Sequence, residues 1–138
     1  ADGWSGIALK RHTDVENLSI PEAVCAAASS AASAIEARAI VAFTEGGTTA
    51  RLISKYRPNS SLLAFTPSES VRQQMALYWG VCPFTMPRGG PPEAWIQEAE
   101  RRLKAEGLVK TRDRIAIVSG TMAGQVGGTN VLKLHEVG

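Results

Sequence analysis

The residues best suited to chemistry form one short segment that is rich in glycine and threonine. Residues Thr44–Arg51 read TEGGTTAR, and they lie where an apolar strand is expected to end and a helix to begin. Glycine allows the backbone to turn sharply there, and the first amides of a helix lack partners within the helix. Those amides, the helix dipole and the hydroxyls of Thr44, Thr48 and Thr49 together suit an anion, especially phosphate. The alternative, a tight turn capped by threonine, stays open on this pattern alone.

A second glycine-rich segment is expected to lie at the same edge of the sheet. Residues Gly120–Asn130 read GTMAGQVGGTN and follow the fourth expected strand. Ligands in open α/β sheets bind outside the carboxyl ends of the strands, so both loops should open toward the same side. Neither segment is a nucleotide-binding fingerprint, because no Gly-Lys-Ser/Thr follows the first and no helix is expected after the second. A flexible connection to an edge strand is the alternative for this second loop.

Side chains for bond-breaking chemistry are sparse. His12 falls in the N-terminal lead-in and His135 on the last expected strand, and no serine or cysteine lies in a nucleophile elbow. Cys25 and Cys82 have no metal-ligand partner at a useful spacing, so two free thiols in a reducing cytoplasm and no metal site are expected. The sequence therefore predicts no catalytic residues.

The elements that position these segments follow from helix caps and apolar patterns. A poorly structured lead-in is expected over residues 1–18, and a single domain over residues 19–138. Ser19 and Glu22 form a capping box that starts the first helix, and Gly80 suits a left-handed helix cap. The expected order is helix 19–37, strand 39–44, helix 48–56, strand 61–66, a helix from a capping box at Thr66–Glu69 to Trp79, strand 81–85, helix 93–106, strand 114–119 and strand 130–136.

The fold class is predicted from the way strands and helices alternate. Strands that are apolar throughout and separated by amphipathic helices are typical of a parallel sheet buried on both faces. Right-handed crossovers then place helices on both faces, which gives a three-layer α/β sandwich. Only about ten residues separate the fourth and fifth strands, fewer than a parallel crossover needs. We therefore expect a five-stranded mixed sheet with four parallel strands and the last strand antiparallel, at or near an edge.

The bulk composition excludes several classes of protein. The chain has 138 residues, of which 44% are hydrophobic and 20% charged, as is typical of one soluble globular domain. Its formal net charge of +2 gives no electrostatic case for a nucleic acid or a membrane surface as partner. No apolar run approaches the ~20 residues of a membrane helix. We expect a cytoplasmic protein without nucleic-acid or membrane partners.

A series of short motifs is similar to those of one known family. Residues Ala39–Pro58 read AIVAFTEGGTTARLISKYRP, a strand, a loop and a helix that end in a Tyr-Arg-Pro turn. The further motifs are LAFTP at 63–67, LYWGV at 77–81, GLV at 107–109, SG at 119–120 and GGTN at 127–130. Together, in this order, they resemble the C-terminal α/β domain of pyruvate kinases over nearly the whole chain from about Ser19 onward.

That resemblance implies a fold and a role. The family's C-terminal domain has a five-stranded sheet with an antiparallel last strand, which agrees with the fold expected above. Family members transfer phosphate from phosphoenolpyruvate to ADP with magnesium and usually potassium, on a separate TIM barrel of ~250 residues that this chain is too short to hold. The chain is thus expected to be a non-catalytic regulatory and oligomerisation domain with no cofactor of its own. The implied partners are the catalytic barrel of the parent chain, further copies in a homotetramer, and a sugar-phosphate or nucleotide effector.

The resemblance also implies which residues bind the phosphate of the effector. By position they are Thr44, Gly46, Gly47, Thr48 and Thr49 in the first loop, and Gly124, Gly127 and Gly128 in the second. Two departures from the family bear on this site: Thr48 stands where lysine or arginine is common, and Glu45 adds a negative charge. A carboxylate within a few ångströms of a phosphate costs roughly 1 kcal/mol or more.

Two other functions stay open at this point. One is a free-standing phosphometabolite-binding domain without a catalytic barrel, which would use the same loops. The other, less favoured, is a small enzyme with a site built from the loop residue Arg88, Glu45 and the threonines. That enzyme would need ionisable groups that converge in one pocket.

Overall fold

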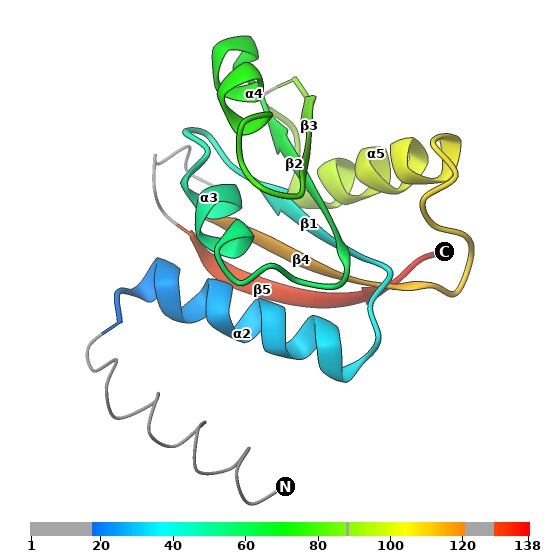
Figure 1. Ribbon diagram of the computed structural model, residues 1–138. Coiled ribbons are helices and arrows are strands. Elements are labelled where there is room, and N and C mark those ends of the chain that lie inside the picture. The colour runs from blue at the N-terminus through cyan, green and yellow to red at the C-terminus, as the bar shows by residue number, and fades with distance from the viewer. Residues whose placement is uncertain (1–17, 88, 121–128) are drawn as a thin grey trace, which may run out of the picture.

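One sheet organises the molecule. The computed structural model describes residues 18–87, 89–120 and 129–138. In chain order the elements are α2 (Ile20–Ala34), β1 (Ala39–Phe43), α3 (Thr48–Ser54), β2 (Ser61–Thr66), α4 (Glu69–Met75), β3 (Val81–Thr85), α5 (Pro92–Ala105), β4 (Arg114–Gly120) and β5 (Thr129–Glu136). The strand order across the sheet is β3-β2-β1-β4-β5, which places β1 at the centre (Figure 1).

The strand directions confirm the predicted mixed sheet. β1 is parallel to β2 and to β4, and β2 is parallel to β3, so the first four strands run the same way. β5 is antiparallel to β4 and lies at the sheet edge, as its short connection predicted. Pro83 lies within β3 at the opposite edge, where a residue without an N–H group is tolerated.

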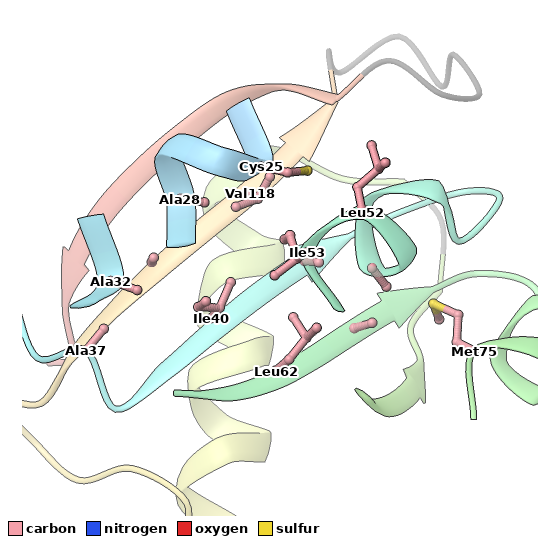
Figure 2. Close-up of a cluster of buried hydrophobic side chains, with 14 residues drawn as sticks. Cys25, Ala28, Ala32, Ala37, Ile40, Leu52, Ile53, Leu62, Met75 and Val118 are labelled. Carbon is pink, nitrogen blue, oxygen red and sulfur yellow. The ribbon is translucent and has the colours of Figure 1, made fainter. Parts of the chain in front are cut away.

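Successive residues of the central strand point to opposite faces of the sheet, and each face is covered. Ile40 and Ala42 of β1 belong to a buried cluster that they share with α2, α3 and Met75 of α4 (Figure 2). Val41 and Phe43 belong to a second buried cluster, which they share with α5. Helices therefore cover both faces, which confirms the predicted three-layer sandwich.

Small side chains allow α2 to lie close to the sheet. Its N terminus has the predicted capping box: the Glu22 N–H donates to Ser19 Oγ (3.2 Å), and the Ser19 N–H donates to Glu22 Oε1 (3.0 Å). Cys25, Ala28 and Ala32 are the buried residues of the helix. Figure 2 shows these three side chains on the side of α2 that faces β4 and β5.

The N terminus of α4 is capped by a different residue from the one predicted. The N-cap residue is Ser68 instead of Thr66, and its Oγ accepts the Val71 N–H (3.2 Å). Thr66 is the last residue of β2 and is buried, and its Oγ1 accepts the Ser68 N–H (3.3 Å). The prediction of Thr66 as the N-cap residue was wrong because strand pairing already fixes its backbone. The helix begins instead after Ser68, the next residue with a hydroxyl.

The C terminus of α4 also differs from the prediction. The helix ends at Met75 instead of Trp79. The Leu77 and Tyr78 N–H groups donate to carbonyls only three residues earlier, so the chain tightens from an α-helix into turns. Gly80 has a left-handed φ of +71°, as predicted, and it reverses the chain into β3.

The two cysteines differ in exposure, and this difference predicts their reactivity. Both are free thiols; Cys25 is buried and Cys82 is exposed. Burial raises the pKa of the Cys25 thiol from 9.0 to about 11. Because the thiolate is the nucleophile, we expect iodoacetamide at about pH 8 to label Cys82 quickly and Cys25 only after unfolding. Peptide mass spectrometry before and after addition of urea measures both.

The raised pKa also predicts a loss of stability in alkali. The unfolded thiol releases its proton near pH 9.0 and the folded thiol near pH 11, so the unfolded state binds fewer protons between these values. The free energy of unfolding should therefore fall as the pH rises through this interval. A Cys25→Ala variant should show a shallower decline in urea titrations at pH 9 and pH 11. Equal slopes in both proteins would contradict the assignment.

Candidate functional site

The glycine–threonine segment forms a tight turn between β1 and α3. Gly47 is the N-cap residue of α3, with a φ of +87° that residues with a side chain rarely adopt. Thr44 directly follows β1, and its Oγ1 accepts the Gly47 N–H (2.9 Å). One of the amides assigned to an anion thus has a partner within the turn. This contact is the threonine cap that was the alternative interpretation of the segment.

The three threonines differ in their access to solvent. Thr44 and Thr48 are half-buried, as is Gly46. Thr49 is 2% exposed, and its carbonyl accepts a long hydrogen bond from Cys25 Sγ (3.9 Å). Thr44 and Thr48 are therefore the two threonines of the turn that are partly open to solvent, whereas Thr49 packs against the core.

Backbone hydrogen bonds fix the turn to the neighbouring strand β2. The Thr44 N–H donates to the Phe65 carbonyl (2.9 Å), and the Thr66 hydroxyl donates to the Glu45 carbonyl (3.3 Å). Because Thr66 is itself buried, the turn is held in place before any ligand arrives. A site of this kind loses little conformational entropy on binding.

The strands that precede the two loops, β1 and β4, end at the same edge of the sheet. Phe43 of β1 pairs with Ser119 of β4 in parallel register, so Thr44 and Gly120 begin their loops side by side. The remaining predicted contact residues Arg88, Gly124, Gly127 and Gly128, together with His12, lie outside the described part of the chain. The structure therefore describes the first loop and β4, the strand that leads into the second loop.

Gly47 is the residue of the turn whose replacement should have the clearest effect. A Cβ atom there would lie 3.3 Å from Met75 Cγ and 3.4 Å from Val71 Cγ1, both on α4. The left-handed backbone adds a cost of its own, so Gly47→Ala should lower the free energy of unfolding by about 2–3 kcal/mol. Urea denaturation measures this loss.

Gly80→Ala is the matched control for Gly47→Ala. Gly80 has a similar φ of +71°, but no atom lies within 4 Å of the Cβ that would be added. Only the cost of the left-handed backbone remains, so Gly80→Ala should lower the free energy of unfolding by about 1–2 kcal/mol. Equal losses in the two variants would show that contact between Gly47 and α4 is unimportant for the position of the turn.

A polar pair far from the turn was not anticipated from the sequence. His135 Nε2 of β5 lies 2.5 Å from Glu100 Oε1 of α5, and both side chains are mostly buried. The Gly138 N–H also donates to Glu100 Oε1 (3.4 Å). The pair joins the α5 layer to the edge strand and to the end of the chain. Periodicity within each element carries no signal for a contact between residues so far apart in the chain.

The described residues offer neither a metal cluster nor a membrane-spanning helix. Among them, no group of three or more His, Cys, Asp or Glu side chains is arranged to hold a metal ion. No helix within that part of the chain is long and apolar enough to cross a membrane. The described residues form a doubly wound α/β domain with a preformed turn at the carboxyl edge of its sheet.

Comparison with known proteins places this domain in a family. The family described as "Pyruvate kinase, alpha/beta domain" matches residues 22–135. Pyruvate kinase of Lactobacillus delbrueckii subsp. bulgaricus is 34% identical over 137 residues, which cover 99% of this chain and 23% of the relative. Pyruvate kinase of Staphylococcus epidermidis is 38% identical over 130 residues, which cover 94% of this chain and 22% of the relative. The chain therefore belongs to the pyruvate kinase α/β domain family.

Solved structures agree with this assignment. A crystal structure of pyruvate kinase from Cryptosporidium parvum superposes with a TM-score of 0.82 at 29% identity, over 90% of this chain and 24% of that one. A structure of Cryptosporidium parvum pyruvate kinase in complex with ADP gives a TM-score of 0.82 at 30% identity. The chain spans about a quarter of the length of the relatives that it matches.

Proposed function

We propose that this chain is the C-terminal module of an enzyme that transfers phosphate from phosphoenolpyruvate to ADP, and that the module itself performs no bond chemistry. The observation that carries the proposal is the family match over residues 22–135, combined with coverage of only 23% of a full-length relative. The remaining length of such a relative is ample for a catalytic barrel of ~250 residues. Magnesium and potassium would then act in that barrel, within the cytoplasm.

The module's proposed work is assembly and regulation. The catalytic barrel of the parent chain is its first partner, and further copies in a homotetramer are the second. The edge strand β5 supports self-association, because an edge strand offers backbone donors and acceptors to another chain. The third partner is a sugar phosphate or nucleotide, bound where Thr44, Gly46 and Thr48 meet solvent beside the end of β4.

Two measurements test the catalytic part of this proposal. The genomic reading frame should continue upstream into a barrel-coding segment. The purified 138-residue chain should form no ATP from phosphoenolpyruvate and ADP in the presence of magnesium and potassium. Turnover by the chain alone would overturn the proposal, and a frame without a barrel would favour the free-standing phosphometabolite-binding domain instead.

Two substitutions in the same turn should change effector affinity in opposite directions. Thr48→Val keeps the shape of the side chain but removes a hydroxyl donor, so affinity for fructose 1,6-bisphosphate should fall about fivefold to tenfold. Glu45→Gln removes a negative charge beside the phosphate, so affinity should rise about fivefold. Calorimetric titration of each purified variant measures both effects.

The control for this pair is Thr111→Val, in an exposed turn before β4. It should leave the affinity within about twofold of the starting protein. A general loss of stability cannot explain effects of opposite sign in neighbouring residues. If neither Thr48→Val nor Glu45→Gln alters binding, the effector lies elsewhere.

A further inference from the structure

A pocket of about 400 Å³ lies at the far end of α3 from the glycine–threonine turn. It forms where the C terminus of α3 meets the turns between α4 and β3. Its lining residues are Arg51, Ser54, Lys55, Arg57, Leu77, Tyr78 and Trp79. This volume falls within the range of sites for small ligands. We call it the α3 pocket.

The α3 pocket has a strong excess of positive charge. Arg51, Lys55 and Arg57 line it, and no acidic residue of the described ranges does. The carboxylate of Glu22, at the start of α2, interacts with two of these cations. Hydrogen bonds from Ser19, with smaller contributions from the charges of Lys55 and Arg51, lower the pKa of Glu22. Glu22 is already engaged in its capping box and interacts with only two of the three cations, so the lining keeps an excess of positive charge that attracts anions.

Basic residues at the end of a helix are favoured by the helix dipole in any protein, so charge alone is not decisive. The second observation is the conformation of Arg57. Its φ is +46°, a left-handed value that arginine rarely adopts. In this conformation its guanidinium lies 4.9 Å from the centre of the Trp79 ring. Strained residues of this kind gather at binding sites, where surrounding bonds hold them.

Hydrogen bonds connect the two walls of the pocket and hold that arrangement. The Arg57 N–H donates to the Ser54 carbonyl (3.1 Å), and the Ser54 hydroxyl donates to the Trp79 carbonyl (2.6 Å). The cationic end of α3 is thereby tied to the aromatic turn before β3. The guanidinium and the indole are thus positioned together before any ligand binds.

Apolar surface surrounds the charged groups. Trp79 is 50% exposed, Leu77 is 85% exposed, and Tyr56 beside Arg57 is 46% exposed. Exposed aromatic and aliphatic side chains concentrated at one place usually mark a binding surface. A ligand that suits this lining needs an anionic group and a flat apolar group.

We infer that the α3 pocket binds a small aromatic phosphate or carboxylate. The anionic group lies among Arg51, Lys55 and Arg57, and the ring packs on Trp79 and Leu77. The Arg57 guanidinium lies over the Trp79 ring, so one ligand can give its anionic group to the N–H groups of Arg57 and its flat ring to the same aromatic surface. The inference does not depend on the glycine–threonine turn, which lies at the opposite end of α3.

Phenyl phosphate is the probe that tests the inference. In ¹H–¹⁵N spectra of the 138-residue chain, it should shift the Trp79 indole signal, which a Trp79→Phe variant identifies. Inorganic phosphate and phenol each supply half of the ligand, so each should bind at least about tenfold more weakly. Arg57→Asn removes the charge but keeps a residue that tolerates left-handed φ, and it should raise the Kd about tenfold.

Arg112→Asn is the matched control, because Arg112 is also an exposed arginine with positive φ (80°) at a different place on the surface. It should change the Kd by less than about twofold. The inference would be overturned if the Trp79 signal did not shift up to about 10 mM probe. Equal weakening by Arg57→Asn and Arg112→Asn, or shifts confined to the Gly47 amide, would overturn it too. Burial of Trp79 against a barrel in a longer parent chain, with no probe binding there, would assign the surface to that protein contact instead.

Discussion

Replacing Ile53 by alanine is expected to lower the free energy of unfolding by about 2–5 kcal/mol. Ile53 of α3 is fully buried in the cluster that contains Ile40 of β1 and Leu62 of β2 (Figure 2). The substitution removes contacts with both strands and leaves a cavity that a short helix, packed on two strands, fills only in part. For a domain of this size the midpoint of thermal unfolding should fall by about 10 °C. Urea and thermal denaturation followed by circular dichroism measure both quantities.

Ile20→Ala is the matched control for Ile53→Ala. The chemical change is the same and the residue is again helical, but Ile20 is 67% exposed at the start of α2. Ile20→Ala should lower the free energy of unfolding by no more than about 0.5 kcal/mol. Comparable losses at Ile20 and Ile53 would mean that α3 does not bury its apolar side against the sheet as described.

Enlarging Ala28 to leucine should be the second most damaging change, with a loss of about 1–3 kcal/mol. Ala28 is fully buried where α2 crosses the sheet, between Cys25 and Ala32 on the same side of the helix. No partner can withdraw easily, because the opposing backbone of β4 and β5 is hydrogen-bonded in the sheet. The added carbons must lift α2 away from the sheet. Urea denaturation gives the loss directly.

Ala27→Leu adds the same carbons one position earlier, on a residue that is exposed. Leucine and alanine have similar helix propensities, so the free energy of unfolding should change by no more than about 0.5 kcal/mol. A stable Ala28→Leu variant, or an equally unstable Ala27→Leu variant, would show that α2 packs on a different face.

The sheet was predictable because its signals are local. Residues 61–66 read as a continuous apolar run between polar turns, and β2 occupies these same residues. The direction of β5 followed from the length of its connection, since too few residues are available for a parallel crossover. Gly80 and Gly107 both have the left-handed φ that a chain reversal after a helix requires.

Features that depend on distant parts of the chain were not predictable. Arg57 and Trp79 meet only because the turn after α4 folds back over the end of α3, and no periodicity encodes that contact. The pairing of His135 with Glu100 has the same origin. The cap of α4 moved from Thr66 to Ser68 because strand pairing and capping compete for one residue.

The candidate site was predictable in position but not in the access of each residue. The sequence placed Thr44, Thr48 and Thr49 in one turn at the carboxyl end of a strand, and the structure brings them together there. It could not distinguish Thr49 from Thr48, because helix geometry turns adjacent side chains toward different surroundings. Thr49 is buried beside α2, whereas Thr48 stays within reach of solvent.

The central place of β1 has a consequence for synthesis of the protein on the ribosome. Ile40 pairs with Leu62 on one side, but its other neighbour, Ala116, is translated much later. Because synthesis adds roughly 5–20 residues per second, one edge of β1 stays unpaired for several seconds until β4 has been translated. During that time the nascent chain exposes apolar surface and an unpaired strand edge, both of which favour aggregation. The yield of folded protein in cells should therefore depend on chaperones and on the speed of translation.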